Sequence, residues 1–312
     1  MAAEKGFLKG LIFRLVRKHI AGGTADSAIR TALKLNEKKI HTSITFLNEN
    51  PRDSAQVRYN VNAYLQLIRQ ISRLHAKSDI SVRPSQFGYE FGNGTFEKSI
   101  EELLEKAKES KINVWVENEN GHDANALLGA LEAYKSQYLG IEVPLSKVYN
   151  KSVCDRCKRA GLQIKISAYE ESEKKGPQSG AKSGRNQKQT QKQKQKQKQK
   201  QETPMLEDVL PIFRGKKAIV SSYDEKIIYR AIKHGKASKK DIVFETLYGF
   251  SPKKVKRLMK DNINVRMYIP YGKDWVPFAI KRLTEGHIRD IAVAVLDGEA
   301  KNSDDGDGKG NR

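Results

Sequence analysis

The sequence predicts an α/β protein built as a (β/α)8 barrel of the TIM type. Eight short runs rich in Val, Ile, Phe and Tyr alternate with eight helical patterns along the 312 residues. That alternation is typical of parallel strands joined by crossover helices. A doubly wound open sheet would have fewer strands and a glycine-rich first turn. Neither GNG at 92–94 nor GG at 22–23 follows a strand as that turn requires.

The predicted strands share β-branched and aromatic residues, as strands buried on both faces require. They span 42–47, 79–84, 113–118, 138–145, 163–169, 217–223, 241–247 and 264–270. The predicted helices between them place apolar residues at steps of three and four. They span 54–77, 96–109, 123–135, 147–159, 204–213, 224–234, 251–260 and 275–285. Gly161, Gly235 and Asn262 stand where helices are expected to end.

The barrel domain is predicted to cover residues 41–296, after an N-terminal helical segment at 1–40 and before a disordered tail at 297–312. The first part of the N-terminal segment is basic and amphipathic. Docking on the barrel is the favoured interpretation of this segment, and peripheral contact with a membrane is the alternative. Arg14 and Arg17 interrupt its apolar residues, so we expect no signal peptide. No run reaches about 18 apolar residues, so no transmembrane helix is expected.

Ten of the +21 formal charges lie in one tract. Residues 174–201 contain ten basic residues, no acidic ones and almost nothing apolar. Lys, Gln, Gly and Ser cannot form a core, so residues 174–202 are predicted to be a disordered insert after the fifth strand. The remaining excess of +11 permits weak attraction to nucleic acid or anionic lipid. No aromatic residue interleaves the tract, so no specific nucleic-acid partner is expected.

The two cysteines, Cys154 and Cys157, form a CxxC pair. No second pair and no nearby His accompany them, and their spacing puts both thiols on one helical face. Helix packing is therefore favoured over a redox or zinc role. Because two cysteines give no disulfide framework, a reducing compartment and a cytoplasmic location are expected.

The active residues of such a barrel lie at the carboxyl ends of the strands and in the loops that follow. The polar and aromatic residues at those places are Arg83, Gln86, Glu117, Glu119, Tyr169, Tyr223, Asp224, Glu245, Tyr268 and Tyr271. Arg83 and Glu117 stand on consecutive strands. A purely structural ion pair between them is the alternative to a role in catalysis.

Several motifs resemble those of the proline dehydrogenase family. VRMYIPYGKDWVPFAIKRLTE (265–285) is similar to the family's last strand, its Pro-Tyr-Gly turn and a helix with Tyr-x-x-Arg-Arg-x-x-Glu. VFETLYGF (243–250) resembles the strand-seven motif, and HIAGGTADSAIRTALKLNEKKI (19–40) resembles the first helix. SVRPSQFG, QIKISAY and SSYDE fall in order at the remaining motif positions. The resemblance covers roughly residues 12–296.

This resemblance implies a flavoenzyme on a distorted (β/α)8 barrel. Members of the family bind FAD, oxidise L-proline to Δ1-pyrroline-5-carboxylate and pass the electrons to a quinone or another acceptor. Arg83 stands where the family has a lysine and Glu117 where it has an aspartate. Together with Tyr268, these are the catalytic residues that the resemblance implies.

The resemblance also implies a substrate site for proline or a related imino acid. Lys281 and Arg282 align with the family's paired arginines and would bind the substrate carboxylate. Glu285 would hold these cations in place. Tyr169 would form a wall of the site, and Leu247 would pack over the substrate ring.

The cofactor residues that the resemblance implies are Gln163, Tyr223 and Glu245. Several positions depart from the family's pattern. Pro144 aligns with a glutamine, Gln163 with an arginine, Ile166 with a lysine, Tyr223 with a histidine and Phe278 with a tyrosine. A reduced flavin needs a positive charge nearby, and Lys165 and Arg83 are the nearby residues that carry one.

Two alternatives to a flavoenzyme follow from these departures and from the charge. In the first, the barrel has lost flavin binding and serves another anionic ligand or an interaction role. In the second, it is a basic protein that binds nucleic acid or a membrane surface.

Overall fold

The structure is a computed structural model, and it describes nine stretches of the chain. They are residues 17–48, 50–92, 94–119, 124–145, 151–168, 206–210, 217–234, 238–276 and 278. The predicted insert at 174–202, the predicted tail at 297–312 and most of the predicted helix at 275–285 lie outside these residues. The domain limits proposed from the sequence therefore stay predictions.

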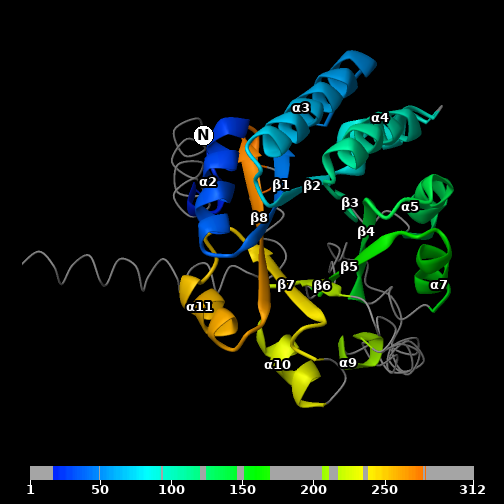
Figure 1. Cartoon of the computed structure of the whole chain (residues 1–312). Helices are drawn as coiled ribbons and strands as arrows, with labels where there is room; N and C mark the ends of the chain where they lie inside the picture. Colours follow the sequence, from blue (N-terminus) through cyan, green and yellow to red (C-terminus); the bar gives the residue numbers. More distant parts are fainter. Residues whose placement is uncertain are drawn as a thin grey trace, which may run out of the picture.

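Eight parallel strands close into a barrel in the order of the sequence (Figure 1). The strands are β1 (His41–Leu47), β2 (Ser78–Val82), β3 (Val114–Val116), β4 (Leu139–Pro144), β5 (Gln163–Ser167), β6 (Ala218–Ser221), β7 (Ile242–Leu247) and β8 (Asn264–Gly272). The ring closes where β8 pairs with β1, from His41 opposite Arg266 to Leu47 opposite Gly272. The predicted barrel is confirmed, and each predicted strand is found close to its expected limits.

Helices surround the barrel on its outside (Figure 1). They are α2 (Ala25–Glu37), α3 (Ser54–Arg73), α4 (Thr95–Ser110), α5 (Ala124–Leu131), α7 (Lys151–Arg159), α9 (Leu206–Val209), α10 (Lys226–Lys233) and α11 (Pro252–Lys260). Short 3-10 turns add η1 (Arg17–His19), η2 (Pro84–Phe87), η3 (Tyr89–Phe91) and η4 (Glu132–Tyr134). Side-chain caps at Thr24 and Asp53 accept backbone N–H groups and fix where α2 and α3 begin.

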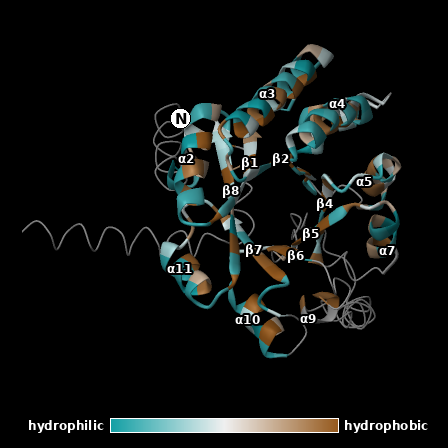
Figure 2. Cartoon of the chain, in the orientation of Figure 1, coloured by the Kyte–Doolittle hydropathy of each residue, from teal (hydrophilic) through white to brown (hydrophobic). Residues whose placement is uncertain are grey.

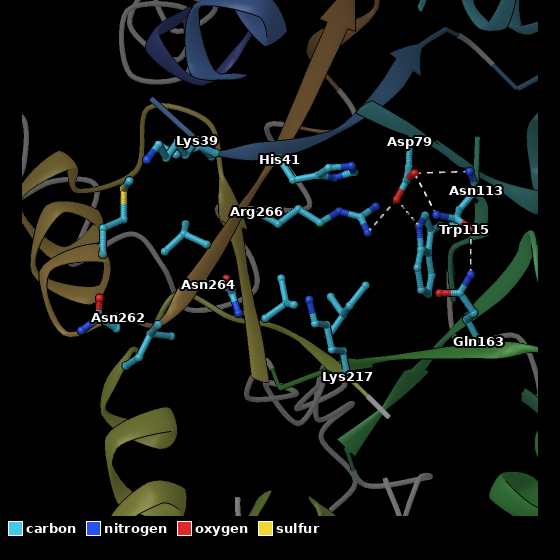
Figure 3. A pocket seen from close by; sticks show the side chains of 16 residues that line it. Lys39, His41, Asp79, Asn113, Trp115, Gln163, Lys217, Asn262, Asn264 and Arg266 are labelled. Atoms are coloured by element: carbon cyan, nitrogen blue, oxygen red, sulfur yellow. Dashed lines mark hydrogen bonds and ion pairs between the residues drawn. The ribbon is translucent and has the colours of Figure 1, made fainter. Parts of the chain in front are cut away.

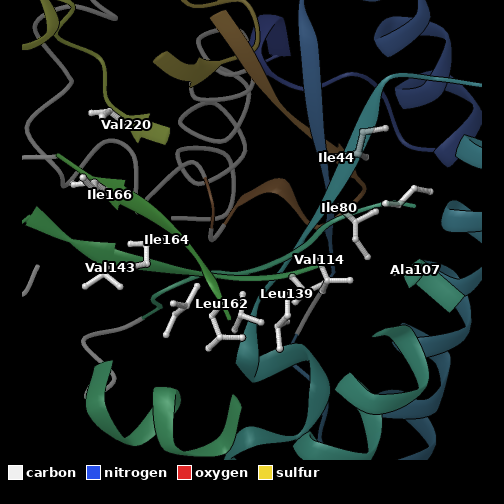
Figure 4. Packing of buried hydrophobic residues seen from close by; sticks show 14 of the residues in the cluster. Ile44, Ile80, Ala107, Val114, Leu139, Val143, Leu162, Ile164, Ile166 and Val220 are labelled. Carbon is white, nitrogen blue, oxygen red and sulfur yellow. The ribbon is translucent and has the colours of Figure 1, made fainter. Parts of the chain in front are cut away.

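The apolar core lies between the outer face of the barrel and the inner faces of the helices. Hydrophobic residues run along β5, β6 and β7 and alternate with hydrophilic ones on the helices (Figure 2). Side chains at alternate strand positions, such as Ile44, Ile80 and Val114, point outward into this layer (Figure 4). Cys154 and Cys157 form no disulfide with each other and are buried in the same layer. Among the described residues, no group of His, Cys, Asp or Glu could hold a metal ion.

The other strand positions point into the barrel, and many of these side chains are charged. Asp79, Lys165, Glu245 and Arg266 are all buried there. Buried charges require partners, and these residues pair with one another across the barrel. Polar contacts between strands therefore take the place that branched apolar layers hold in most barrels of this kind.

The described part of the N-terminal segment docks at the carboxyl end of β8. Ala21 donates its backbone N–H to the carbonyl of Pro270 (2.9 Å), and Gly272 donates to the carbonyl of Gly22 (2.9 Å). His19 Nδ1 lies 2.8 Å from the carbonyl oxygen of Tyr248. The segment thus extends the sheet where β7 has ended. No helix in the described stretches is long and apolar enough to cross a membrane.

Candidate active site

The mouth of the barrel, at the carboxyl ends of the strands, collects side chains from distant parts of the sequence. The Tyr268 hydroxyl of β8 donates a hydrogen bond to Glu117 Oε1, just after β3, at 2.7 Å. Leu247 and Tyr223 pack beside Tyr268 in a cluster completed by Leu47 and Phe278. The mouth therefore combines the ionisable carboxylate of Glu117 with an apolar, aromatic wall.

Glu117 stays ionised at neutral pH. Burial would raise the pKa of Glu117, but the charge of Lys165 and the hydrogen bond from Tyr268 outweigh it. They hold the pKa below its usual value near 4.5. Its side chain remains only partly buried at the mouth, so a positively charged group of a ligand can reach it.

Arg83 follows β2 and is held by partners other than Glu117. Its Nη2 donates to the carbonyl of Asn48 at 2.9 Å, and its Nη1 lies 3.8 Å from Glu119 Oε1. The backbone N–H of Ser85 donates to the other oxygen of Glu119 (3.1 Å). The pairing of Arg83 with Glu117 considered from the sequence is therefore replaced by one with Glu119. The buried Nε of Arg83 has no hydrogen-bond partner among the described residues.

Lys165 of β5 supplies a buried positive charge below the mouth. Its ammonium group lies 2.8 Å from Glu142 Oε2, 3.1 Å from Glu245 Oε1 and 5.7 Å from the ring centroid of Tyr268. Burial would lower the pKa of Lys165, but the carboxylates of Glu142 and Glu245 outweigh it and raise the pKa above 10.5. The lysine is therefore a fixed cation at neutral pH.

Glu245 of β7 lies one layer beneath the mouth. Its two oxygens lie between Lys165 and Arg266, whose Nε is 2.9 Å away. Burial would raise its pKa, but these two cations hold the pKa below 4.5. Glu245 is completely buried. Its position suits a residue that holds Lys165 in place. It does not suit contact with the cofactor, which is the role that the sequence predicted.

Gln163 does not join the other predicted site residues. It stands at the start of β5, at the amino end of the barrel, and its amide donates to Asn113 Oδ1 and to the carbonyl of Gln137. The expectation that Gln163 contacts the cofactor conflicts with this position. Ile166, aligned with a family lysine, points outward into the core. The inward cation of this strand is Lys165, one position earlier.

Four predicted residues lie outside the described residues. They are Tyr169, Lys281, Arg282 and Glu285. Their roles remain those that the resemblance implies.

Sequence reasoning missed several polar residues of the barrel interior. They are Asp79, Glu142 and Arg266. A signal was present in the sequence. In LGIEVP and in QIKIS, one charged residue stands between two apolar residues of a strand. In a strand with an apolar outer face, such a charge must point into the barrel.

The residues at the mouth fit a flavin in three respects. Arg83 offers a buried N–H donor without a partner among the described residues. Lys165 offers a fixed positive charge. Tyr223 and Phe250, whose ring centroids are 5.0 Å apart, offer aromatic surface next to the apolar cluster. A planar, electron-accepting ring system needs this combination of flat walls and local cations.

The fold and the mouth define a barrel of the enzyme type, with its polar groups at the carboxyl ends of the strands. No protein-family model matches the chain. Proline dehydrogenase 2 of Bacillus subtilis (strain 168) is 22% identical over 281 residues, 86% of this chain and 85% of that protein. Proline dehydrogenase 1 of the same organism is 20% identical over 282 residues, 86% of each chain. Over most of its length the chain is therefore similar to proline dehydrogenases.

Solved structures show the same fold. Proline utilization A (PutA) from Bdellovibrio bacteriovorus superposes with a TM-score of 0.66 and 14% identity over 89% of this chain. A mutant PutA of Bradyrhizobium japonicum superposes with a TM-score of 0.63 and 16% identity over 87%. The chain spans only 33% and 30% of those two longer chains.

Proposed function

We propose that the chain is an FAD-dependent oxidoreductase that oxidises L-proline, or a related imino acid, to Δ1-pyrroline-5-carboxylate. The comparisons support an oxidoreductase of the proline dehydrogenase type. The observation that carries the proposal is the Tyr268–Glu117 hydrogen bond at the mouth, with the ammonium group of Lys165 beneath the Tyr268 ring. These three residues come from β8, β3 and β5, and only the closed barrel brings them together.

The substrate would bind by its two charges and its ring. The ionised Glu117 suits the positively charged nitrogen of an imino acid, and the Tyr268 hydroxyl holds that carboxylate in one orientation. Leu247 and Tyr268 offer apolar surface to the ring. Lys281 and Arg282, with Glu285 as their partner, would bind the carboxylate, and Tyr169 would form a further wall. That arrangement excludes water from the carbon that loses hydride.

FAD, when bound, would supply the acceptor for the hydride of the carbon beside the nitrogen. The nitrogen would first give a proton to Glu117, and its lone pair would then form the C=N bond as the C–H bond breaks. Arg83 and Tyr223 would hold the FAD at the mouth. Lys165 would stabilise negative charge on the reduced ring, and Glu245 would keep that lysine in place.

The electron acceptor is proposed to be a quinone or a similar molecule. A cytoplasmic location, with peripheral contact to a membrane that supplies the quinone, suits that acceptor. No specific nucleic-acid partner is proposed.

The first test is the visible absorption spectrum of the purified protein, before and after anaerobic addition of proline. We expect the bands of oxidised flavin, and we expect proline to bleach them. Flavin bands that proline leaves unchanged would contradict the substrate. A colourless protein that takes up no added FAD would contradict the cofactor.

The second test is the variant Arg282→Ala, which removes the cation proposed to bind the substrate carboxylate. We expect the KM for proline to rise by about tenfold or more, because a charge-assisted hydrogen bond is lost, while the melting temperature stays the same. Arg69→Ala, an exposed arginine on α3, is the matched control. An unchanged KM in Arg282→Ala would remove Arg282 from the site.

The alternative is a barrel that no longer binds flavin and serves another anionic ligand. Pro144 and Tyr223 favour it, because they stand where the family has a glutamine and a histidine. The colourless outcome of the spectrum, together with binding of small anions by the unmodified protein, would support this alternative.

A further inference from the structure

A second concave site lies at the opposite, amino-terminal end of the barrel. A cavity of about 490 Å³ opens there, between the starts of β1, β2, β5, β7 and β8 (Figure 3). In barrels of this kind that end normally contributes stability alone. A cavity of this volume falls within the range of small-molecule sites, and neither the mouth nor its residues extend to it.

The wall of this amino-terminal cavity is positively charged. Exposed Lys39 and Lys217 stand at its rim, and buried Arg266 lies inside it. Asp79 is the one carboxylate among the lining residues, against these three cations. Uncharged amides, among them Asn262 and Asn264, and apolar side chains such as Val243 and Ile263 complete the wall.

Arg266 is held in place without using all its donors. Its Nη1 lies 3.0 Å from Asp79 Oδ2, its Nε lies 2.9 Å from Glu245, and its guanidinium lies 5.0 Å from the ring of Trp115. The same Asp79 oxygen accepts a hydrogen bond from Trp115 Nε1 at 3.0 Å. Arg266 is 2% exposed, and its Nη2 has no hydrogen-bond partner among the described residues. The guanidinium is therefore a fixed, buried positive group behind the wall of the cavity.

His41 projects into the cavity above Arg266 (Figure 3). Protein atoms surround His41 on most sides. Its side chain is nevertheless exposed to solvent, because water can enter the cavity. Burial lowers the pKa of His41 below 6.5, with Asp79 opposing and Arg266 adding to the effect. At neutral pH it therefore offers a neutral ring, with one N–H donor, to a ligand.

Backbone strain is concentrated at the same end of the barrel. The turns that lead into β1, β2, β3, β4 and β8 each contain a residue with positive φ that is not glycine: Lys39 (61°), His75 (51°), Lys111 (55°), Lys135 (43°) and Asn262 (60°). Each costs about 1 kcal/mol relative to glycine. A lysine near a helix C-terminus interacts favourably with the helix dipole. That interaction would be equally available to a lysine at a neighbouring position without positive φ. Three of the five are lysines, so positive charge stands at these strained turns.

A neighbouring cavity of about 510 Å³ shares His41, Asp79 and Asn113 with the first. Lys77 and Lys111 line it. The positive charge therefore continues from one cavity into the next.

We propose that the amino-terminal cavity is a binding site for a small multivalent organic anion, a molecule with two or three carboxylate or phosphate groups. Lys39 and Lys217 would bind the outer anionic groups, and His41 would donate its N–H to the innermost one, with the buried Arg266 guanidinium behind it. Carboxylate and phosphate match a guanidinium equally well in geometry and charge. The volume indicates a molecule larger than an inorganic ion.

The test is isothermal titration calorimetry of the full chain with citrate and, separately, with fructose 1,6-bisphosphate. Ionic strength is held constant with sodium chloride, because exposed charges are screened by salt. We expect saturable binding of at least one of the two anions with one site per chain. The anion that binds more tightly tells whether carboxylate or phosphate is preferred.

Three variants locate the site. Lys39→Gln and Lys217→Gln should each weaken binding about tenfold, because each loses one charge-assisted hydrogen bond. Lys98→Gln, an exposed lysine on α4 away from the cavity, removes the same charge and should leave binding unchanged. All three positions are exposed, so the fold is expected to persist, and the melting temperatures check this.

Two results would overturn the proposal. One is no binding of either anion beyond that of chloride. The other is equal weakening in Lys98→Gln, because the overall charge of the chain would then explain the attraction. Neither result depends on proline oxidation at the mouth, so the proposal stands or falls separately from the proposed activity.

Discussion

Individual side chains inside this barrel are held by charge pairing. Lys165, Glu245 and Arg266 form a continuous series of contacts that ends at Asp79. Each pair joins different strands, so each side chain depends on partners distant in sequence. Removing one member leaves the next as an unpaired buried charge, which is far more costly than the pair itself is stabilising.

Lys165→Met tests that dependence. It should destabilise the fold by about 3–5 kcal/mol, because Glu142 and Glu245 lose their shared cation in a buried site. Lys106→Met, which breaks an exposed pair with Glu109, should cost less than about 1 kcal/mol. Urea unfolding measures both. Adding Glu245→Gln to Lys165→Met should recover part of the loss, and no recovery would show that packing, rather than charge, is responsible.

Tyr268→Phe tests the hydrogen bond at the mouth. It removes the hydroxyl that donates to Glu117, and kcat/KM for proline should fall roughly tenfold or more, because Glu117 loses its fixed orientation. Tyr229→Phe removes a similar hydroxyl, which donates to Asp261 on the outside of the barrel at 2.6 Å. Both variants should lose comparable stability, but only the first should lose activity. Equal kinetics in the two would exclude a role for Tyr268 in the reaction.

Among the elements, the strands keep one face apolar and use the other for polar contacts. The described N-terminal residues add one more piece to the sheet, since Ala21 and Gly22 hydrogen-bond to the end of β8. Their docking requires close approach at Gly249, where φ is 74°. A Cβ there would lie 2.2 Å from the carbonyl oxygen of Lys18.

Gly249→Ala should therefore separate the turn after β7 from the N-terminal segment. We expect a loss of roughly 2–4 kcal/mol, from the left-handed backbone and from the collision with backbone atoms. Gly161→Ala is the matched control, because its φ is 68° but nothing lies within 4 Å of the added Cβ. It should cost only about 1 kcal/mol. Denaturant unfolding measures the free energy of unfolding of both variants. Equal losses of stability would mean that the N-terminal segment moves away from residue 249 at no cost in free energy.

For the molecule as a whole, the interior charges make stability depend on pH. The pKa values of Glu117 and Glu245 are lower in the folded protein than the ordinary value near 4.5. The unfolded chain therefore binds protons first as the pH falls, and the folded state loses stability. Lys165 acts in the opposite direction at high pH, because its raised pKa gives stability that is lost only as the pH rises above 10.5.

The free energy of unfolding should accordingly be constant near neutral pH and should fall as the pH drops below about 4.5. In Glu245→Gln this fall should be shallower, since one of the depressed carboxylates is gone. Urea unfolding at a series of pH values between 3 and 7, a range of roughly one carboxyl titration, measures the slope. An identical slope in the two proteins would assign the acid loss to other carboxylates.

The sequence predicted the order of the elements and the closed barrel. The period of two in the strands and the steps of three and four in the helices are local properties, and parallel strands joined by eight helices have few ways to pack. The family motifs also located Glu117, Tyr268 and Leu247 at the mouth. Cys154 and Cys157 lie buried in the core, as their helical spacing predicted.

Only the tertiary structure decided which strand residues face inward and what they meet there. A shift of one position moves a side chain to the other face of a strand, and this is why Lys165 rather than Ile166 is the interior cation. Residues also differ in their position along the barrel axis. Gln163 lies at the amino end, away from the mouth, and Glu245 lies one layer beneath the mouth. The partners Glu119 for Arg83, and Arg266 for Glu245, join residues far apart in the chain. Such pairs depend on how the strands are staggered around the closed ring, which no local pattern specifies.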